Sequence, residues 1–168
     1  GGWLLLGVED GQVFETAFDH IVWATAAGPA AQVMNQAAAL ARETHDDDTA
    51  AALGDWARVA AALPYTAITT VYALAPGQQL PAPMLALHSS AEAPAQFAFD
   101  RGQLQPDEPT AQGVLAFVVS ASDGEREAVQ AAVLRQAAAQ LGLRGLRPLK
   151  TVVEKRATFA CTPGLQRP

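Results

Sequence analysis

The run Val114-Leu115-Ala116-Phe117-Val118-Val119-Ser120 decides the fold class of this chain, because six consecutive apolar residues leave no polar face. A short run of this kind is typical of a strand in the centre of a sheet. Residues Tyr65–Leu74, which are rich in Thr, Val, Ile and Tyr, predict a second strand. Segments with helical spacing surround both runs, so the sequence predicts an α+β domain.

Shorter strands are predicted on either side of these two. Strand 3–8 and strand 13–23 are expected to form a hairpin, because Asp10-Gly11 supplies the positive φ that a tight turn needs. Strand patterns also occur at 84–88, 96–99 and 149–160.

Three segments have helical patterns. The first covers residues 30–43, and the second begins at a cap formed by Asp48 or Thr49 and ends before Pro64. A capping box of Ser122 and Glu125 opens the third, which Gly142 ends. We therefore expect a single domain over residues 1–168, with a mixed, mainly antiparallel sheet of about six strands and three flanking helices.

Composition excludes several classes of protein. The net charge of −6 argues against a nucleic-acid partner, which needs a basic face. Cys161 is the only cysteine, so no intrachain disulfide exists and a reducing compartment fits. The chain has neither the apolar run of about 20 residues that a membrane-spanning helix needs nor a signal-peptide pattern, so we expect a cytoplasmic protein.

The common cofactor and catalytic motifs are missing from the sequence. It contains no GxGxxG fingerprint, no phosphate-binding loop, no HExxH and no CxxC, and we expect no metal site. His88-Ser89-Ser90 lacks a third group that would orient the histidine as a base. Asp46-Asp47-Asp48 is more typical of a solvated helix start than of a cation site.

The most informative local stretch is Phe18-Asp19-His20-Ile21-Val22-Trp23-Ala24-Thr25-Ala26-Ala27-Gly28-Pro29. We expect Ile21-Val22-Trp23 to end a buried strand, and Pro29 fits the first turn of a helix. The small residues between them would let backbone approach a flat ligand closely. The same pattern is also typical of an ordinary strand–loop–helix joint.

Six stretches together carry a resemblance to a known family: 18–29, 64–72, 80–84, 96–102, 118–122 and 154–164. In order and spacing they resemble the squalene-associated FAD-dependent desaturases, also viewed as hydroxysqualene dehydroxylases of bacterial hopanoid biosynthesis. That family is similar to the phytoene desaturases of the flavin amine oxidase superfamily. The most specific part is Glu154-Lys155-Arg156-Ala157-Thr158-Phe159-Ala160-Cys161-Thr162-Pro163-Gly164, combined with Phe99-Asp100-Arg101-Gly102.

This resemblance implies that the chain is the middle, substrate-binding portion of a larger flavoenzyme. The N-terminal GxGxxG unit and the C-terminal flavin segment of the family are not in it. We therefore expect the full-length parent to bind FAD, and this portion alone to bind it weakly or not at all. The implied chemistry is reductive removal of a hydroxyl from hydroxysqualene to give squalene, with desaturation as the other possibility.

The resemblance also assigns site residues. Ala24, Thr25 and Ala26 match the segment that runs beside the flavin, and strand 65–74, with Thr69 and Val71, matches the one that lines the substrate side. Its Ile68-Thr69-Thr70 has no lysine where amine oxidases often carry one, which disfavours an amine oxidase. From strand alternation, Phe97 and Phe99 share one face, either in the core or in the wall of an apolar substrate tunnel.

The expected partners are an apolar isoprenoid substrate, the rest of the parent flavoenzyme and, through exposed apolar surface, a second copy of the chain. In the parent, contact with the inner membrane is compatible with a lipid-soluble substrate. We expect an apolar groove between the sheet and the helices. The alternatives are a non-enzymatic α+β interaction module, because no catalytic constellation is evident, and a flavin amine oxidase fragment.

Overall fold

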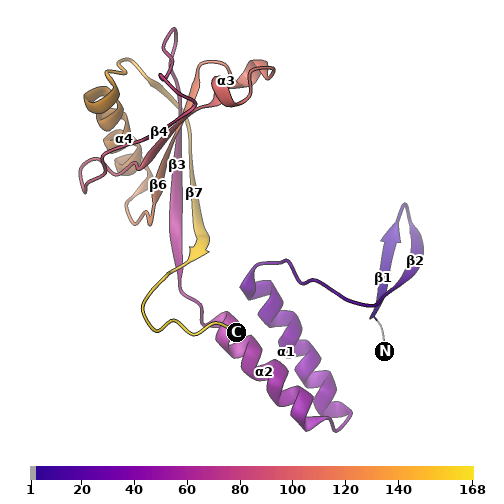
Figure 1. Cartoon of the computed structure of the whole chain (residues 1–168). Helices are drawn as coiled ribbons and strands as arrows, with labels where there is room; N and C mark the ends of the chain where they lie inside the picture. The colour runs from indigo at the N-terminus through magenta and orange to yellow at the C-terminus, as the bar shows by residue number, and fades with distance from the viewer. Residues whose placement is uncertain (1–2) are drawn as a thin grey trace. The chain divides into compact units, whose positions relative to one another are not determined.

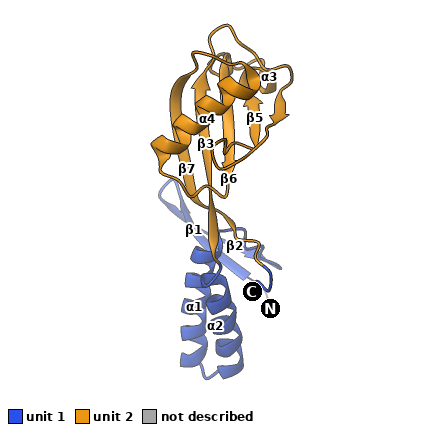
Figure 2. Ribbon diagram, turned by 90° about the vertical axis from the view of Figure 1, so that its left-hand side faces the viewer, with its two compact units in different colours: residues 1–63, 163–168 blue, residues 64–162 orange. Residues whose placement is uncertain are grey.

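The computed structural model describes residues 3–168 and divides them into two compact units. Unit 1 comprises residues 3–63 and 163–168, and unit 2 comprises residues 64–162 (Figure 2). The single domain expected from the sequence is thus resolved into two units, each with its own internal contacts.

Unit 2 is built on an antiparallel sheet of five strands in the order β4-β5-β6-β3-β7. The sheet contains these strands: β3 (Tyr65–Leu74), β4 (Met84–Ala86), β5 (Phe97–Asp100), β6 (Val114–Ser120) and β7 (Arg147–Phe159). The apolar run of β6 occupies the middle of the order, as its composition predicts. The α+β class is confirmed, with every strand pair antiparallel in the part of the chain that is described.

Helix α4 (Arg126–Leu141) covers one face of this sheet (Figure 2). Phe117, Val71 and Val133 are fully buried where the helix packs on the strands, so this interface forms the core of unit 2. Gly142 ends the helix in the left-handed conformation, with φ of 67°, as predicted. The predicted capping box is wrong, because the helix starts at Arg126 and Ser122 instead accepts a hydrogen bond from Thr69.

The other side of the sheet carries α3 (Arg101–Leu104), a single turn that follows β5 directly (Figure 1). The sequence predicts only a turn here, and the Asp100 carboxylate converts it into a helical turn by accepting from the backbone N–H of Gln103. A short 3-10 helix at Pro109–Ala111 then leads into β6.

Unit 1 contains the hairpin of β1 (Trp3–Glu9) and β2 (Gln12–Phe18), joined by Asp10 and Gly11, both with positive φ. These two strands form a sheet of their own, so the single sheet of about six strands is corrected to a five-stranded and a two-stranded sheet. The second strand ends at Phe18, not at residue 23. Residues 21–23 lie outside any strand and are exposed, which overturns the expectation of a buried strand end.

Unit 1 also contains two helices, α1 (Ala27–Glu43) and α2 (Asp47–Ala61), which pack against each other. Small side chains allow the close contact, because Ala31, Ala57 and Ala60 are buried between them. Asp46, rather than Asp48 or Thr49, caps α2 by accepting from the backbone N–H of Thr49. No helix within residues 3–168 is long and apolar enough to cross a membrane.

Candidate functional site

Strand β3 divides its residues between two unlike faces of the sheet. Thr69 and Val71 are almost completely buried on the face that α4 covers. The Thr69 hydroxyl donates to Ser122 Oγ over 2.8 Å, which satisfies its polar group inside the domain. These two candidate substrate residues therefore belong to the helix-covered core.

Phe97 and Phe99 lie on the opposite face, which we call the open face. Directly paired residues of antiparallel strands share a face, and Phe97 pairs with Val118, which in turn pairs with Thr70. In the same way Phe99, Ala116 and Tyr72 form the next row. The structure thus brings Phe97 and Phe99 together, with ring centroids 6.4 Å apart, and separates both from Thr69 and Val71.

The residues of β3 that do face Phe97 and Phe99 are Thr70 and Tyr72, which the sequence analysis did not single out. Both sets of alternate residues in strand 65–74 mix polar and apolar types, so hydrophobic alternation could not tell which set faces the helix. Only the pairing of β3 with the strongly apolar strand β6 could have shown which residues of β3 face Phe97 and Phe99. That pairing depends on the register of the two strands, which the sequence does not give.

The open face is hollowed between the sheet and α3. The hollow has a volume of about 470 Å³, which lies within the ordinary range for ligand sites. Its apolar lining comes from Phe99, Leu104, Ala116 and Val118. The hollow is open to solvent and has the volume of a small-ligand site, with these four apolar residues and the polar groups of Thr70, Tyr72, Arg101 and Gln105 in its wall.

The apolar groove that the sequence predicts between sheet and helices is not where it was expected. The centre of the interface between the sheet and α4 is packed core. A hollow of about 620 Å³ does lie at the N-terminal end of α4, but Glu92, Asp123 and Arg135 contribute charges of both signs to its wall. The apolar hollow therefore lies on the face opposite α4.

Asp100, at the end of β5, is a structural carboxylate. It accepts hydrogen bonds from the backbone N–H of Leu80 and from the side chain and backbone of Gln103. Burial raises the pKa of Asp100, but the hydrogen bonds from Gln103, Leu80 and Gly102 outweigh it and hold the pKa below the ordinary 3.8. A carboxyl group held ionised in this way is a poor proton donor near neutral pH, so Asp100 does not have the properties of a general acid.

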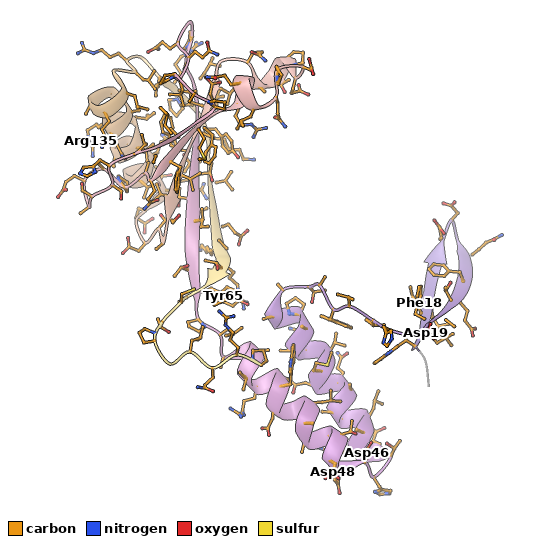
Figure 3. All side chains as sticks on the ribbon, in the orientation of Figure 1. Phe18, Asp19, Asp46, Asp48, Tyr65 and Arg135 are labelled. Atoms are coloured by element: carbon orange, nitrogen blue, oxygen red, sulfur yellow. The ribbon has the colours of Figure 1, made fainter. Side chains whose placement is uncertain are left out.

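The candidate flavin segment Ala24, Thr25 and Ala26 lies in unit 1 between β2 and α1, after the hairpin end marked by Phe18 and Asp19 in Figure 3. All three residues are exposed. The Trp23 indole N–H donates to Thr25 Oγ1 over 2.7 Å, and Ala26 caps α1 without a side-chain hydrogen bond. Ala26 and the residues before it have small side chains, so the backbone of this segment is accessible, and the first turn of α1 has no side-chain cap.

The remaining candidate groups do not converge on a site. Cys161 is exposed and free. Within residues 3–168, no group of three or more His, Cys, Asp or Glu side chains could hold a metal ion. The backbone N–H and C=O of His88 bond to the Gln140 side chain, which ties the loop after β4 to α4.

No protein-family model matches the chain, and no curated protein is significantly similar to it.

Proposed function

We propose that this chain is the substrate-binding portion of an FAD-dependent oxidoreductase, and that the open face of unit 2 holds an apolar isoprenoid such as hydroxysqualene or squalene. One observation carries the proposal: one face of the five-stranded sheet is packed under α4, whereas the other presents aromatic and aliphatic side chains around a hollow of about 470 Å³. The choice of an isoprenoid as substrate and of FAD as cofactor comes from the family resemblance.

The exposed apolar area on this face extends beyond the hollow. Phe97 is 38% exposed, and Met84, which pairs with Phe99, is 53% exposed. Val152 of the edge strand β7, which pairs with Thr70 and so lies on the same face, is 39% exposed. Exposed apolar side chains that share one face of a sheet favour an interaction site, and a flexible hydrocarbon chain would cover them without needing polar partners.

The candidate flavin residues Ala24, Thr25 and Ala26 support the second half of the proposal. They would contact the ring through backbone, because none has a side chain large enough to exclude it. When bound, the flavin supplies hydride equivalents for reductive removal of a hydroxyl group, or accepts them in a desaturation. The role of the open face is to bind and orient the chain and to exclude water from its apolar part.

The two methionines of the chain provide a direct test of substrate binding. Met84 lies on the open face in unit 2, whereas Met34 lies in α1 of unit 1. In the full chain labelled with ¹³C at the methionine methyl groups, squalene delivered from cyclodextrin should shift the Met84 signal and leave the Met34 signal in place.

A matched pair of substitutions localises the effect. Phe97 and Phe14 are both 38% exposed, but Phe14 lies in the hairpin of unit 1. Phe97→Ser should weaken squalene binding, and Phe14→Ser should not. An unshifted Met84 signal at saturating squalene, or equal effects of both substitutions, contradicts the proposed binding face.

The flavin is tested on the full-length gene product, purified without added cofactor. Visible flavin absorption that is released on denaturation is the expected result. A protein that remains colourless after incubation with FAD refutes the oxidoreductase and favours a second candidate, a non-enzymatic interaction module. The specific observation in favour of that candidate is the hairpin of unit 1, in which Leu4, Leu6, Val8 and Val13 are exposed.

A further inference from the structure

We infer that the hollow on the open face selects an amphiphilic ligand, with an anionic head beside Arg101 and an apolar chain that extends over Phe99 and Val118. This inference rests on the proposed function, because it concerns the same face of the sheet. It adds that an isoprenoid with a negatively charged end binds there more tightly than an uncharged one such as squalene or hydroxysqualene.

The position of Arg101 follows from the end of strand β5. Phe99 faces the hollow, and Asp100, the next residue, pairs with Leu115 and is buried on the helix-covered side. The hydrogen bonds of Asp100 to Leu80 and Gln103 fix the turn of α3 that follows. Arg101 is therefore held at the wall of the hollow next to an aromatic ring.

The guanidinium of Arg101 has donors to spare. It donates through Nη2 to the side-chain oxygen of Gln105, the residue after α3, and this bond holds the group along the wall. No ion pair to Arg101 occurs among residues 3–168, and no acidic residue is among those that line the hollow. A guanidinium presents five N–H donors that match the geometry of carboxylate and phosphate groups.

A second cation lies near the same end of the open face. Lys150 of β7 pairs with Tyr72, another lining residue, so both side chains project from this side of the sheet. The acidic residue that β7 places on this face, Glu154, pairs with Ile68 toward the opposite end of β3. The open face thus carries Arg101 and Lys150 at the α3 end, the apolar residues Val118 and Val152 next to them, and Glu154 toward the opposite end.

This arrangement favours one orientation of a bound chain. An anionic head at Arg101 would form charge-assisted hydrogen bonds, which are stronger than those to a neutral oxygen. The chain would then cover Ala116 and Val118 toward Phe97, where apolar contact with hydrocarbon removes exposed surface from water. A hydrocarbon without a polar head would gain only the apolar contact and not the charge-assisted hydrogen bonds.

The test compares two ligands that differ only in the head group, farnesol and farnesyl phosphate, below their aggregation concentrations. Binding is followed by the Met84 methyl signal of the full chain, with Met34 as the internal reference. Farnesyl phosphate should bind about tenfold more tightly than farnesol, since a hydrogen bond to a charged group in a partly exposed site contributes about that factor. The difference should shrink as NaCl is raised.

Substitutions assign the effect to Arg101. Arg101→Gln should remove the advantage of farnesyl phosphate and leave farnesol binding unchanged, and Arg101→Lys should retain part of it. Arg135→Gln is the control, because Arg135 is an exposed arginine on α4, which covers the other face (Figure 3). This change removes the same charge and should leave both affinities unchanged.

Three results overturn the inference. If farnesol and farnesyl phosphate bind equally well, the hollow does not discriminate between a neutral and a charged head group, although the proposed apolar binding face stands. If Arg135→Gln weakens farnesyl phosphate binding as much as Arg101→Gln does, the effect is one of overall charge. If neither ligand shifts the Met84 signal, the inference and the proposed binding face fail together.

Discussion

Gln136 of α4 connects the helix to the loop that precedes β5, and its replacement by leucine should destabilise unit 2 more than any other single glutamine change on this helix. The side chain is only 3% exposed. Its Oε1 accepts from the backbone N–H of Ala95 over 2.8 Å, and its Nε2 donates to the carbonyls of Ala95 and His88 over 2.8 and 3.1 Å. Leucine keeps the helix propensity but removes all three bonds.

The magnitude follows from the burial of the groups left behind. Ala95 is fully buried, so its N–H and C=O would lose their partner where no water reaches them. Each unsatisfied buried group costs about 1–3 kcal/mol, so for these two groups we expect a loss of about 2–6 kcal/mol in the free energy of unfolding of unit 2. This is a large fraction of the stability of an ordinary domain.

Gln140→Leu is the matched control. Gln140, one helical turn further along, forms the same kind of bonds to the backbone of His88, over 3.0 and 2.7 Å, but His88 and Gln140 are both exposed. Water replaces the lost partner there, so the cost should stay below about 1 kcal/mol.

The assay is urea unfolding followed by the Met84 methyl signal, which reports unit 2, because the three tryptophans, Trp3, Trp23 and Trp56, all lie in unit 1. The Met34 signal of unit 1 should keep its midpoint in both variants. Equal losses for Gln136→Leu and Gln140→Leu would refute the reasoning, because burial of the freed groups would then not determine the cost.

Three further predictions concern other parts of the molecule. Because the pKa of Asp100 lies below 3.8, its carboxylate stabilises the folded state above that pH and the contribution is lost as the pH falls further; Asp100→Asn should flatten this acid dependence of the urea midpoint. Gly142→Ala should cost about 1 kcal/mol in thermal unfolding, since φ of 67° is unfavourable for alanine although no neighbouring atom obstructs its Cβ, and a Tm equal to that of the original chain would contradict this. Val8 and Val13 are paired and exposed across the hairpin, so replacing Val8 by Glu and Val13 by Lys should reduce self-association in light scattering, and an unchanged mass would show that another surface mediates it.

Local patterns located the regular elements of this chain well. The composition of 65–74 and 114–120 gives strands β3 and β6 with the predicted ends, and Gly142 ends α4 as its conformational freedom suggests. The hairpin turn at Asp10-Gly11 forms as predicted for the same reason. In each case the feature that predicts the structure lies in the residues of the element or in their nearest neighbours in the sequence.

Caps and element ends were less predictable. Ser122 has the sequence signature of a helix cap, but its hydroxyl bonds to Thr69, a residue more than fifty positions away. Residues 21–23 have a strong strand composition, yet no strand pairs with them within residues 3–168. At Ser122 a tertiary contact overrode the local signature, whereas at residues 21–23 the propensity had no partner strand in the described part of the chain to act on.

The candidate site shows where sequence reasoning reaches its limit. Phe97 and Phe99 share a face because residues two apart in a strand always do, and this required no knowledge of the partner strands. Whether Thr69 or Thr70 accompanies them depended on the register with β6 and on which face α4 covers. A shift of one residue exchanges the two faces, and no property of strand 65–74 alone distinguishes them.

The sequence by itself determined the α+β class, the main strands and helices, and the absence of common cofactor motifs, since these follow from composition, periodicity and turn chemistry. Only the tertiary structure decided that the chain forms two units, that the sheet is covered on one face, and that Arg101 lines the hollow on the other. The physical reason is that faces, hollows and the pairing of distant residues arise from strand register and helix packing, which join parts of the chain that share no local signal.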